Sequence, residues 1–82
     1  MSSNRLIMQG KLQELKEQRR KLTLRADSLM ESITADLTLY EVTKLVDIDT
    51  ERVRVLSTEL DEIKQEVLEL DTHIQKLRDE LG

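Results

Sequence analysis

The second half of the sequence carries an uninterrupted heptad pattern. Apolar residues recur there at alternating steps of three and four, and no polar residue interrupts them: Val53, Leu56, Leu60, Ile63, Val67, Leu70, Ile74, Leu77 and Leu81. This is the 3.5-residue period of an α-helix whose apolar seam faces another helix. Because a narrow apolar stripe stays exposed until a second stripe covers it, this helix requires a partner, either from the rest of the chain or from a second copy.

The first half of the chain contains a second seam with the same period. Its members are Met8, Leu12, Leu15, Arg19, Leu22, Ala26, Leu29 and Ile33. Arg19 is the one charged member, and we expect its methylenes to cover the seam while its guanidinium pairs with an acid at the edge, Asp71 or Glu66. A polar residue in a seam can also fix the register or the number of helices that associate.

The two seams match in an antiparallel hairpin whose facing residues have position numbers totalling 89. The apolar layers in this register are Leu12 with Leu77, Leu15 with Ile74, Leu22 with Val67, Ala26 with Ile63, Leu29 with Leu60, and Ile33 with Leu56. The flanking positions then pair Lys11 with Glu80, Arg25 with Glu66, and Lys16 with Asp71. Exposed ion pairs contribute only about 0 to 1 kcal/mol each, so we expect them to select the orientation of the helices rather than to supply stability.

Charge is distributed unevenly along the chain, whose net charge is −4. Basic residues predominate from Arg5 to Arg25, and acidic residues predominate from Asp47 to Glu80. A basic helix beside an acidic helix is the pattern expected if the two pair with each other. We therefore expect no nucleic-acid partner, because the acidic helix neutralises the basic one. Weak nucleic-acid binding is the lowest-ranked alternative, and its candidate residues are Arg19, Arg20, Lys21 and Arg25.

These patterns predict an all-α protein, an antiparallel two-helix coiled-coil hairpin that forms a single domain over residues 1–82. We expect a short disordered lead at 1–4, a first helix at 5–36, a tip connection at 37–49 and a second helix at 50–81. The heptad places Asp36 at a seam position, so we expect the seam to pass to Leu37 there.

The tip connection contains signals for helix starts. Residues 38–41 have the form of a capping box, which would begin a short additional helix. Asp47 and Asp49 are candidate N-caps for the second helix, and Glu51 lies favourably near its positive end.

Catalytic and metal-binding chemistry has little support in the sequence. A chain of 82 residues without cysteine is too short for a large enclosed active site, so we predict no enzymatic activity, cofactor, metal or small-molecule substrate. His73 has no second ligand type near it. The acids between 47 and 51 begin like a calcium loop, but Arg52 takes the place of the required glycine and Thr58 that of the bidentate glutamate.

Localisation signals are also few. The apolar run Leu6-Ile7-Met8 is too short for a signal-peptide core or a membrane span. The absence of cysteine suits a reducing compartment. We expect a cytoplasmic protein with no membrane partner.

Apolar residues outside the seams predict self-association. The candidate residues are Leu24, Met30, Val55 and Leu68. The burial in a two-helix seam roughly offsets an ordering entropy of about 1.5 kcal/mol per residue, and pairing into a four-helix dimer would cover these side chains. The competing hypothesis is that they fold back on their own hairpin near the tip.

Two heptad helices joined by a tip that carries Asp47 and Asp49 resemble the N-terminal coiled-coil hairpins of Gre-type transcript cleavage factors, whose acidic tips enter RNA polymerase. This resemblance implies an adaptor that binds a larger machine through its tip. The candidate tip residues are Leu39, Tyr40, Val42, Asp47 and Asp49. The sequence itself favours a non-enzymatic protein–protein interaction or assembly module whose partner is a second copy, with tip binding to another protein as the alternative.

Overall fold

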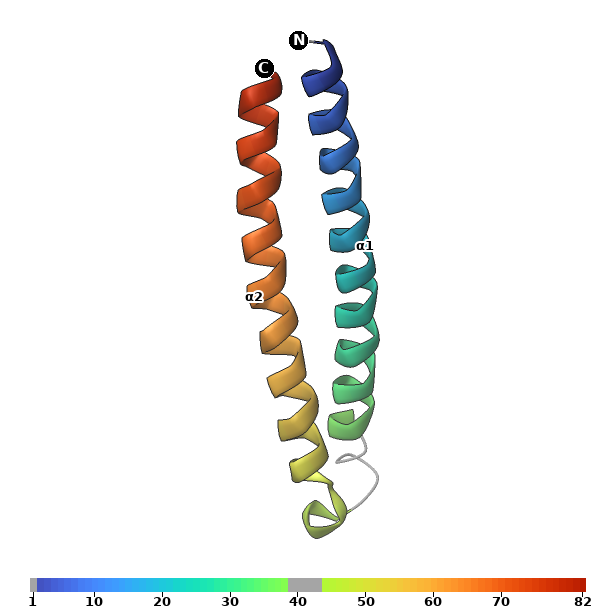
Figure 1. The fold of residues 1–82 in the computed structure, drawn as a ribbon. Helices are drawn as coiled ribbons and strands as arrows, with labels where there is room; N and C mark the ends of the chain where they lie inside the picture. Colours follow the sequence, from blue (N-terminus) through green and yellow to red (C-terminus); the bar gives the residue numbers. More distant parts are fainter. Residues whose placement is uncertain (1, 39–43) are drawn as a thin grey trace.

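The computed structural model describes residues 2–38 and 44–82, which form two long antiparallel helices (Figure 1). Helix α1 spans Ser2–Thr38 and helix α2 spans Thr50–Leu81, with the short 3-10 helix η2 at Leu45–Asp47 before α2. Both termini lie at one end, called here the open end, and the connection lies at the other, the tip (Figure 1). The molecule measures 65 × 15 × 14 Å. The predicted all-α hairpin is confirmed.

Helix α1 is longer than the sequence pattern predicted. It begins at Ser2, so the expected disordered lead is wrong for residues 2–4, and it continues to Thr38, two residues past the predicted end. One contact that holds its first turns is the hydrogen bond that Nη1 of Arg5 donates to the carbonyl oxygen of Leu81, at 2.9 Å. The last turn of α2 therefore anchors the beginning of α1.

The ends of α2 follow local capping rules. The side chain of Asp49 accepts a hydrogen bond from the backbone N–H of Arg52 at 2.9 Å, which confirms Asp49 as an N-cap. Asp47 instead lies in η2. At the other end, Gly82 has φ 79°, and its N–H donates to the carbonyl of Arg78 at 3.0 Å, the left-handed cap that glycine favours. Most of the predicted capping box at 38–41 lies outside the described residues.

The core is the interface between the two predicted seams. Every seam residue of both helices is buried or half-buried, and the deeply buried ones are Leu12, Leu15, Leu29, Ile63 and Ile74. Leu12, Leu15 and Ile74 form one cluster, against which Leu70, Leu77 and Leu81 pack. This cluster agrees with the antiparallel register in which Leu15 faces Ile74.

The expected transfer of the seam to Leu37 is wrong. Asp36 keeps its seam position with a side chain 19% exposed, whereas Leu37 is 52% exposed. Because α1 continues without a change of phase, the heptad carries Asp36 inward. Nε of Arg52 lies 3.0 Å from Oδ2 of Asp36, but this oxygen accepts no hydrogen bond among the described residues. The contact is therefore an ion pair by distance alone, and it offsets the charge that Asp36 carries into the seam.

The register predicts which engineered cysteines form a disulfide. Cysteines replacing Leu15 and Ile74 should crosslink within one chain, because both side chains belong to one cluster and a disulfide requires Cα atoms within about 7 Å. Leu15 with Leu56 is the control, since the register separates these positions by about 27 Å along the helices. The chain has no native cysteine, so peptide mapping after oxidation identifies each link. Closure of the control pair alone would contradict the hairpin, and links found only between chains would indicate a swapped arrangement.

Candidate functional site

Ion pairs join the two helices beside the seam. Arg19 of α1 donates two hydrogen bonds to the carboxylate of Asp71, from Nε at 2.5 Å and from Nη2 at 3.3 Å. Nη2 of Arg25 donates to Glu59 at 2.7 Å. The predicted pairing of the seam residue Arg19 with an edge acid is confirmed. Each contact links a cation of α1 to an anion of α2, as the charge distribution predicted.

The predicted partners of the flanking charges differ from those in the structure. Asp71 pairs with Arg19 instead of Lys16, because Arg19 projects from the seam itself and offers two donors. Arg25 pairs with Glu59, one heptad nearer the tip than the predicted Glu66. The register predicts layers of backbone positions, but a long arginine side chain can reach past its own layer.

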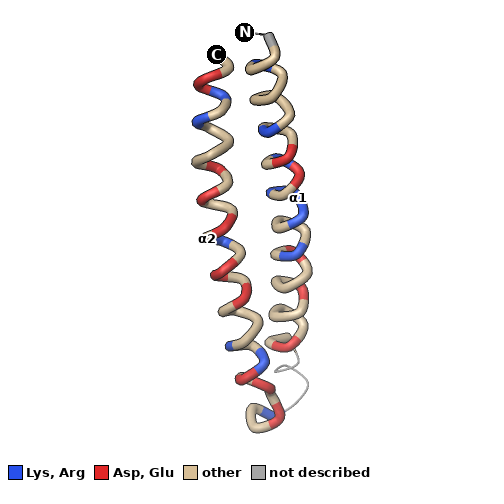
Figure 2. The backbone as a smooth tube through the Cα atoms, in the orientation of Figure 1, with Lys and Arg blue, Asp and Glu red and all other residues tan. Residues whose placement is uncertain are grey.

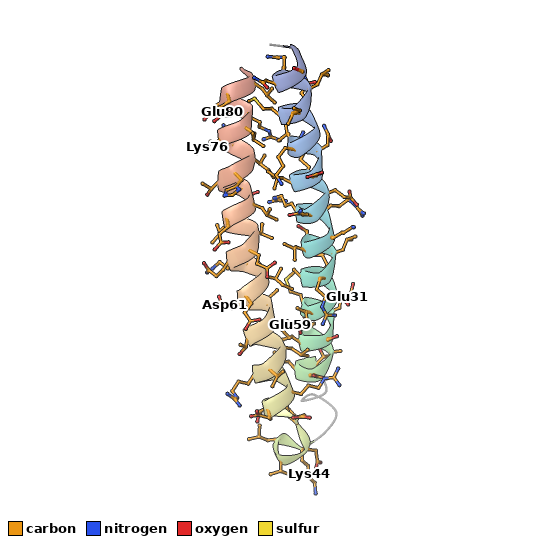
Figure 3. The ribbon with its side chains drawn as sticks, in the orientation of Figure 1. Glu31, Lys44, Glu59, Asp61, Lys76 and Glu80 are labelled. Atoms are coloured by element: carbon orange, nitrogen blue, oxygen red, sulfur yellow. The ribbon has the colours of Figure 1, made fainter. Side chains whose placement is uncertain are left out.

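Lys11 also has a different partner from the predicted one. It forms an ion pair at 3.6 Å with Glu14 of its own helix, three residues ahead, where helical side chains are neighbours. The predicted partner, Glu80, lines a groove with Lys11, but the two form no ion pair among the described residues. Glu59, the partner of Arg25, lies on the side of α2 that faces α1 (Figure 3). Local contacts within a helix thus compete with contacts across the hairpin.

The contact between Arg19 and Asp71 changes the acidity of both groups. The hydrogen bond from Arg19, reinforced by its positive charge, holds the pKa of Asp71 below its ordinary value. The same hydrogen bond and the charge of Asp71 raise the pKa of Arg19. On the surface of α1, the hydrogen bond from Arg20 lowers the pKa of Glu17 in the same way.

The lowered pKa of Asp71 predicts a pH dependence of stability. The charged carboxylate favours the folded state, so its contribution is fully present above the ordinary aspartate pKa of about 3.9 and is lost as the pH falls through the lowered value. Between about pH 5 and pH 2, wild-type protein should therefore lose more free energy of unfolding than Asp71→Asn, as measured by urea denaturation. The control is Asp61→Asn, since Asp61 projects from the outer side of α2 (Figure 3). Equal pH dependence in the two variants would contradict a stabilising role for the contact.

An apolar groove runs beside the seam in the middle of the hairpin. Its volume is about 300 Å³, and Met30 and Leu68, which are 46% and 50% exposed, both line it. The seam contributes Ala26, Leu60, Ile63 and Val67, and the polar rim is Arg19, Thr23, Asp27 and Lys64. A short Ala26 side chain facing Ile63 leaves space that a larger seam residue would fill. We call this surface the apolar groove.

The other two self-association candidates lie elsewhere. Leu24 is 54% exposed and lines an adjoining groove of about 490 Å³ towards the open end, together with Lys16, Arg19, Arg20, Thr23, Asp71, Ile74 and Arg78. Val55 is 55% exposed but lies on the opposite flank, beside Glu59 and Glu62. The structure thus brings Met30 and Leu68 to one groove and Leu24 next to it, and it separates Val55 from them.

The tip presents apolar side chains that the sequence analysis missed. Leu45 and Val46 of η2 are 66% and 85% exposed. Three predicted tip residues, Leu39, Tyr40 and Val42, lie outside the described residues. Asp49 is the N-cap of α2. The signal for Leu45 and Val46 was present in the sequence, since both are apolar residues outside the two seams.

Within residues 2–38 and 44–82, no group of three or more His, Asp or Glu side chains is arranged to hold a metal ion. His73 lines a surface groove with Gln18, Glu66 and Glu69. No helix in the described part of the chain is both long and apolar enough to cross a membrane.

Comparison of the chain with protein-family models, with curated proteins and with solved structures found no match. The resemblance to Gre-type hairpins therefore rests on the two heptad helices and the acids at the tip.

Proposed function

We propose that this chain is a non-enzymatic protein–protein interaction module that assembles with a second copy of itself. The observation that supports this proposal is the apolar groove, where Met30 and Leu68 remain about half exposed beside the seam. A contiguous apolar surface on a small protein marks an interaction site more often than scattered exposed residues do.

The thin core supports the same proposal. Only five side chains are deeply buried in the described residues. A two-helix seam alone leaves a free energy of folding near zero once ordering entropy is counted. Burying apolar surface contributes about 25 cal/mol per Å², so a second hairpin laid over the groove would add the stability that one hairpin lacks. Symmetric dimers are the commonest way to bury such a surface, because one patch serves both copies.

Self-association predicts that the melting temperature rises with protein concentration, because folding is then linked to mass action. Replacing both Leu24 and Leu68 by Lys should lower the melting temperature and shift the mass in light scattering towards the monomer. The control carries Lys at Gln13 and Thr72, both exposed, and it should remain close to wild type. A monomeric mass at high micromolar concentration with a concentration-independent melt would contradict the proposal.

A second candidate function is binding of a larger machine through the tip. Exposed Leu45 and Val46 support it, because two neighbouring apolar side chains at the end of a long hairpin are available to a partner's apolar pocket. The resemblance to Gre-type hairpins suggests RNA polymerase as the partner to test.

Tip binding is best tested at Leu45 and Val46. Replacing Asp47 and Asp49 by Ala is a less clean test, because loss of the Asp49 cap would cost α2 about 1 kcal/mol. The double variant Leu45→Ser with Val46→Ser should abolish binding to purified RNA polymerase, measured by surface plasmon resonance, while the mass of the free protein stays unchanged. No binding by wild-type protein would contradict the RNA polymerase candidate.

Nucleic-acid binding has the least support. Of the four candidate residues, Arg19, Arg20 and Arg25 already pair with carboxylates. We place the protein in the cytoplasm as part of the proposal, on the strength of its cysteine-free sequence.

A further inference from the structure

We infer that the second copy docks on the apolar groove with both tips at the same end, so that each α1 packs against α2 of its partner. The inference rests on the proposed self-association and adds the face and the orientation. It predicts a four-helix bundle in which every neighbouring pair of helices is antiparallel.

The choice of face follows from what lines each flank of the hairpin. The apolar groove is lined mainly by apolar residues, and its rim holds charges of both signs: Arg19 and Lys64 against Asp27. On the opposite flank, the grooves are lined mainly by polar and charged residues of both signs: Arg54, Thr58, Glu59 and Glu62 in one, Gln18, Glu66, Glu69 and His73 in the next, and Lys11, Lys76 and Glu80 in a third. Two copies that met through that flank would bury more charged side chains and less exposed apolar surface, and burying a charge costs free energy unless it gains a partner.

Two symmetric orientations place one groove face on another. A two-fold axis along the hairpin sets the tips side by side and stacks α1 on the partner's α2. A two-fold axis across the hairpin sets the tips at opposite ends and stacks α1 on α1 and α2 on α2. The two arrangements therefore differ in which charges meet.

Charge favours the axis along the hairpin. Helix α1 carries seven basic and five acidic residues, a net charge of +2, whereas α2 carries five basic and nine acidic residues, a net charge of −4. In Figure 2, basic residues gather in the N-terminal half of α1 and acidic residues recur along α2. The axis along the hairpin lays a helix of net charge +2 on one of −4, whereas the transverse axis lays two helices of −4 on each other. Along the groove flank itself α2 contributes Lys64, Asp71 and Arg78, so this difference acts between whole helices rather than at the contact.

The rim of the groove supports the same orientation. Asp27 and Lys64 lie on opposite helices at nearly the same height, since the register places Lys64 opposite position 25. Neither has an ion-pair partner among the described residues. With the axis along the hairpin, Asp27 of each copy lies near Lys64 of the other, so both charges gain a partner. In this dimer the apolar grooves of the two copies face each other between the two pairs of Asp27 and Lys64. The space over each Ala26 is then filled by the Met30 side chains of both copies.

The test uses distances between nitroxide labels in the assembled dimer. Single cysteines replace Asn4 or Ala35, which are exposed at heptad positions on the flank of α1 away from the groove. The two positions lie 31 residues apart, about 46 Å along α1. Double electron–electron resonance on each variant measures the distance between the same site in the two copies.

With the axis along the hairpin, both same-site distances should be short, because each spans only the width of the bundle, two helices of about 11 Å plus the label arms. With the transverse axis, each site and its copy lie on opposite sides of the axis along the length of the bundle. Because Asn4 and Ala35 are about 46 Å apart along α1, the components of their two same-site distances along the bundle must total at least about 90 Å. A long distance at either site would overturn the orientation and leave self-association intact. A monomeric mass in light scattering of the labelled and unlabelled samples would overturn the proposed function and the inference together.

Matched substitutions test the face independently. Met30→Lys should dissociate the dimer, with the apparent dissociation constant raised at least tenfold in analytical ultracentrifugation. Val55→Lys changes an equally exposed apolar residue on the other flank and should leave the constant within twofold of wild type. Dissociation by Val55→Lys but not by Met30→Lys would assign the interface to the opposite face. The helix content measured by circular dichroism at high protein concentration verifies that each variant still folds.

Discussion

Burial of one apolar seam against another is the interaction on which this structure depends. Neither helix has a second apolar face wide enough to form a core by itself, and a lone amphipathic helix is marginal in water. Each seam residue therefore gains from its neighbour on the opposite helix, as Leu15 does from Ile74. The seam, rather than the tip, therefore determines how the helices align.

The two charged residues in the seam show how the hairpin accommodates polar groups. Arg19 lies near the middle and extends to Asp71 at the edge, where both groups keep contact with water. Asp36 lies at the tip end of the seam and is less well accommodated. One of its carboxylate oxygens is buried and accepts no hydrogen bond among the described residues, although the guanidinium of Arg52 lies close to it. In both places the compensating charge comes from the other helix, so these contacts favour the antiparallel register over a shifted one.

A thin core has a consequence for the surface. The side chains that one hairpin leaves uncovered are not scattered evenly. Met30 and Leu68 border a groove that exists because Ala26 is too small to fill its layer. Apolar burial and the charges of Asp27 and Lys64 at the rim both favour a second copy as the cover. A bundle with both tips at one end would present two sets of Leu45 and Val46 to any further partner.

The sequence by itself determined the fold class, the register and the membership of the seam, because heptad spacing dictates which side of each helix can be buried. It also determined the cap at Asp49, since capping is a contact between residues three apart. The exact ion-pair partners were decided only by the tertiary structure, because Arg25 reaches a heptad beyond its own layer and Lys11 finds Glu14 on its own helix. The inward turn of Asp36 was likewise decided by the tertiary structure, since a helix that continues unbroken keeps its phase even where a polar residue results. The tertiary structure also decided that Met30 lies beside Leu68 and that Val55 lies apart from them. The apolar groove is made by residues of both helices, so no single stretch of the sequence contains it.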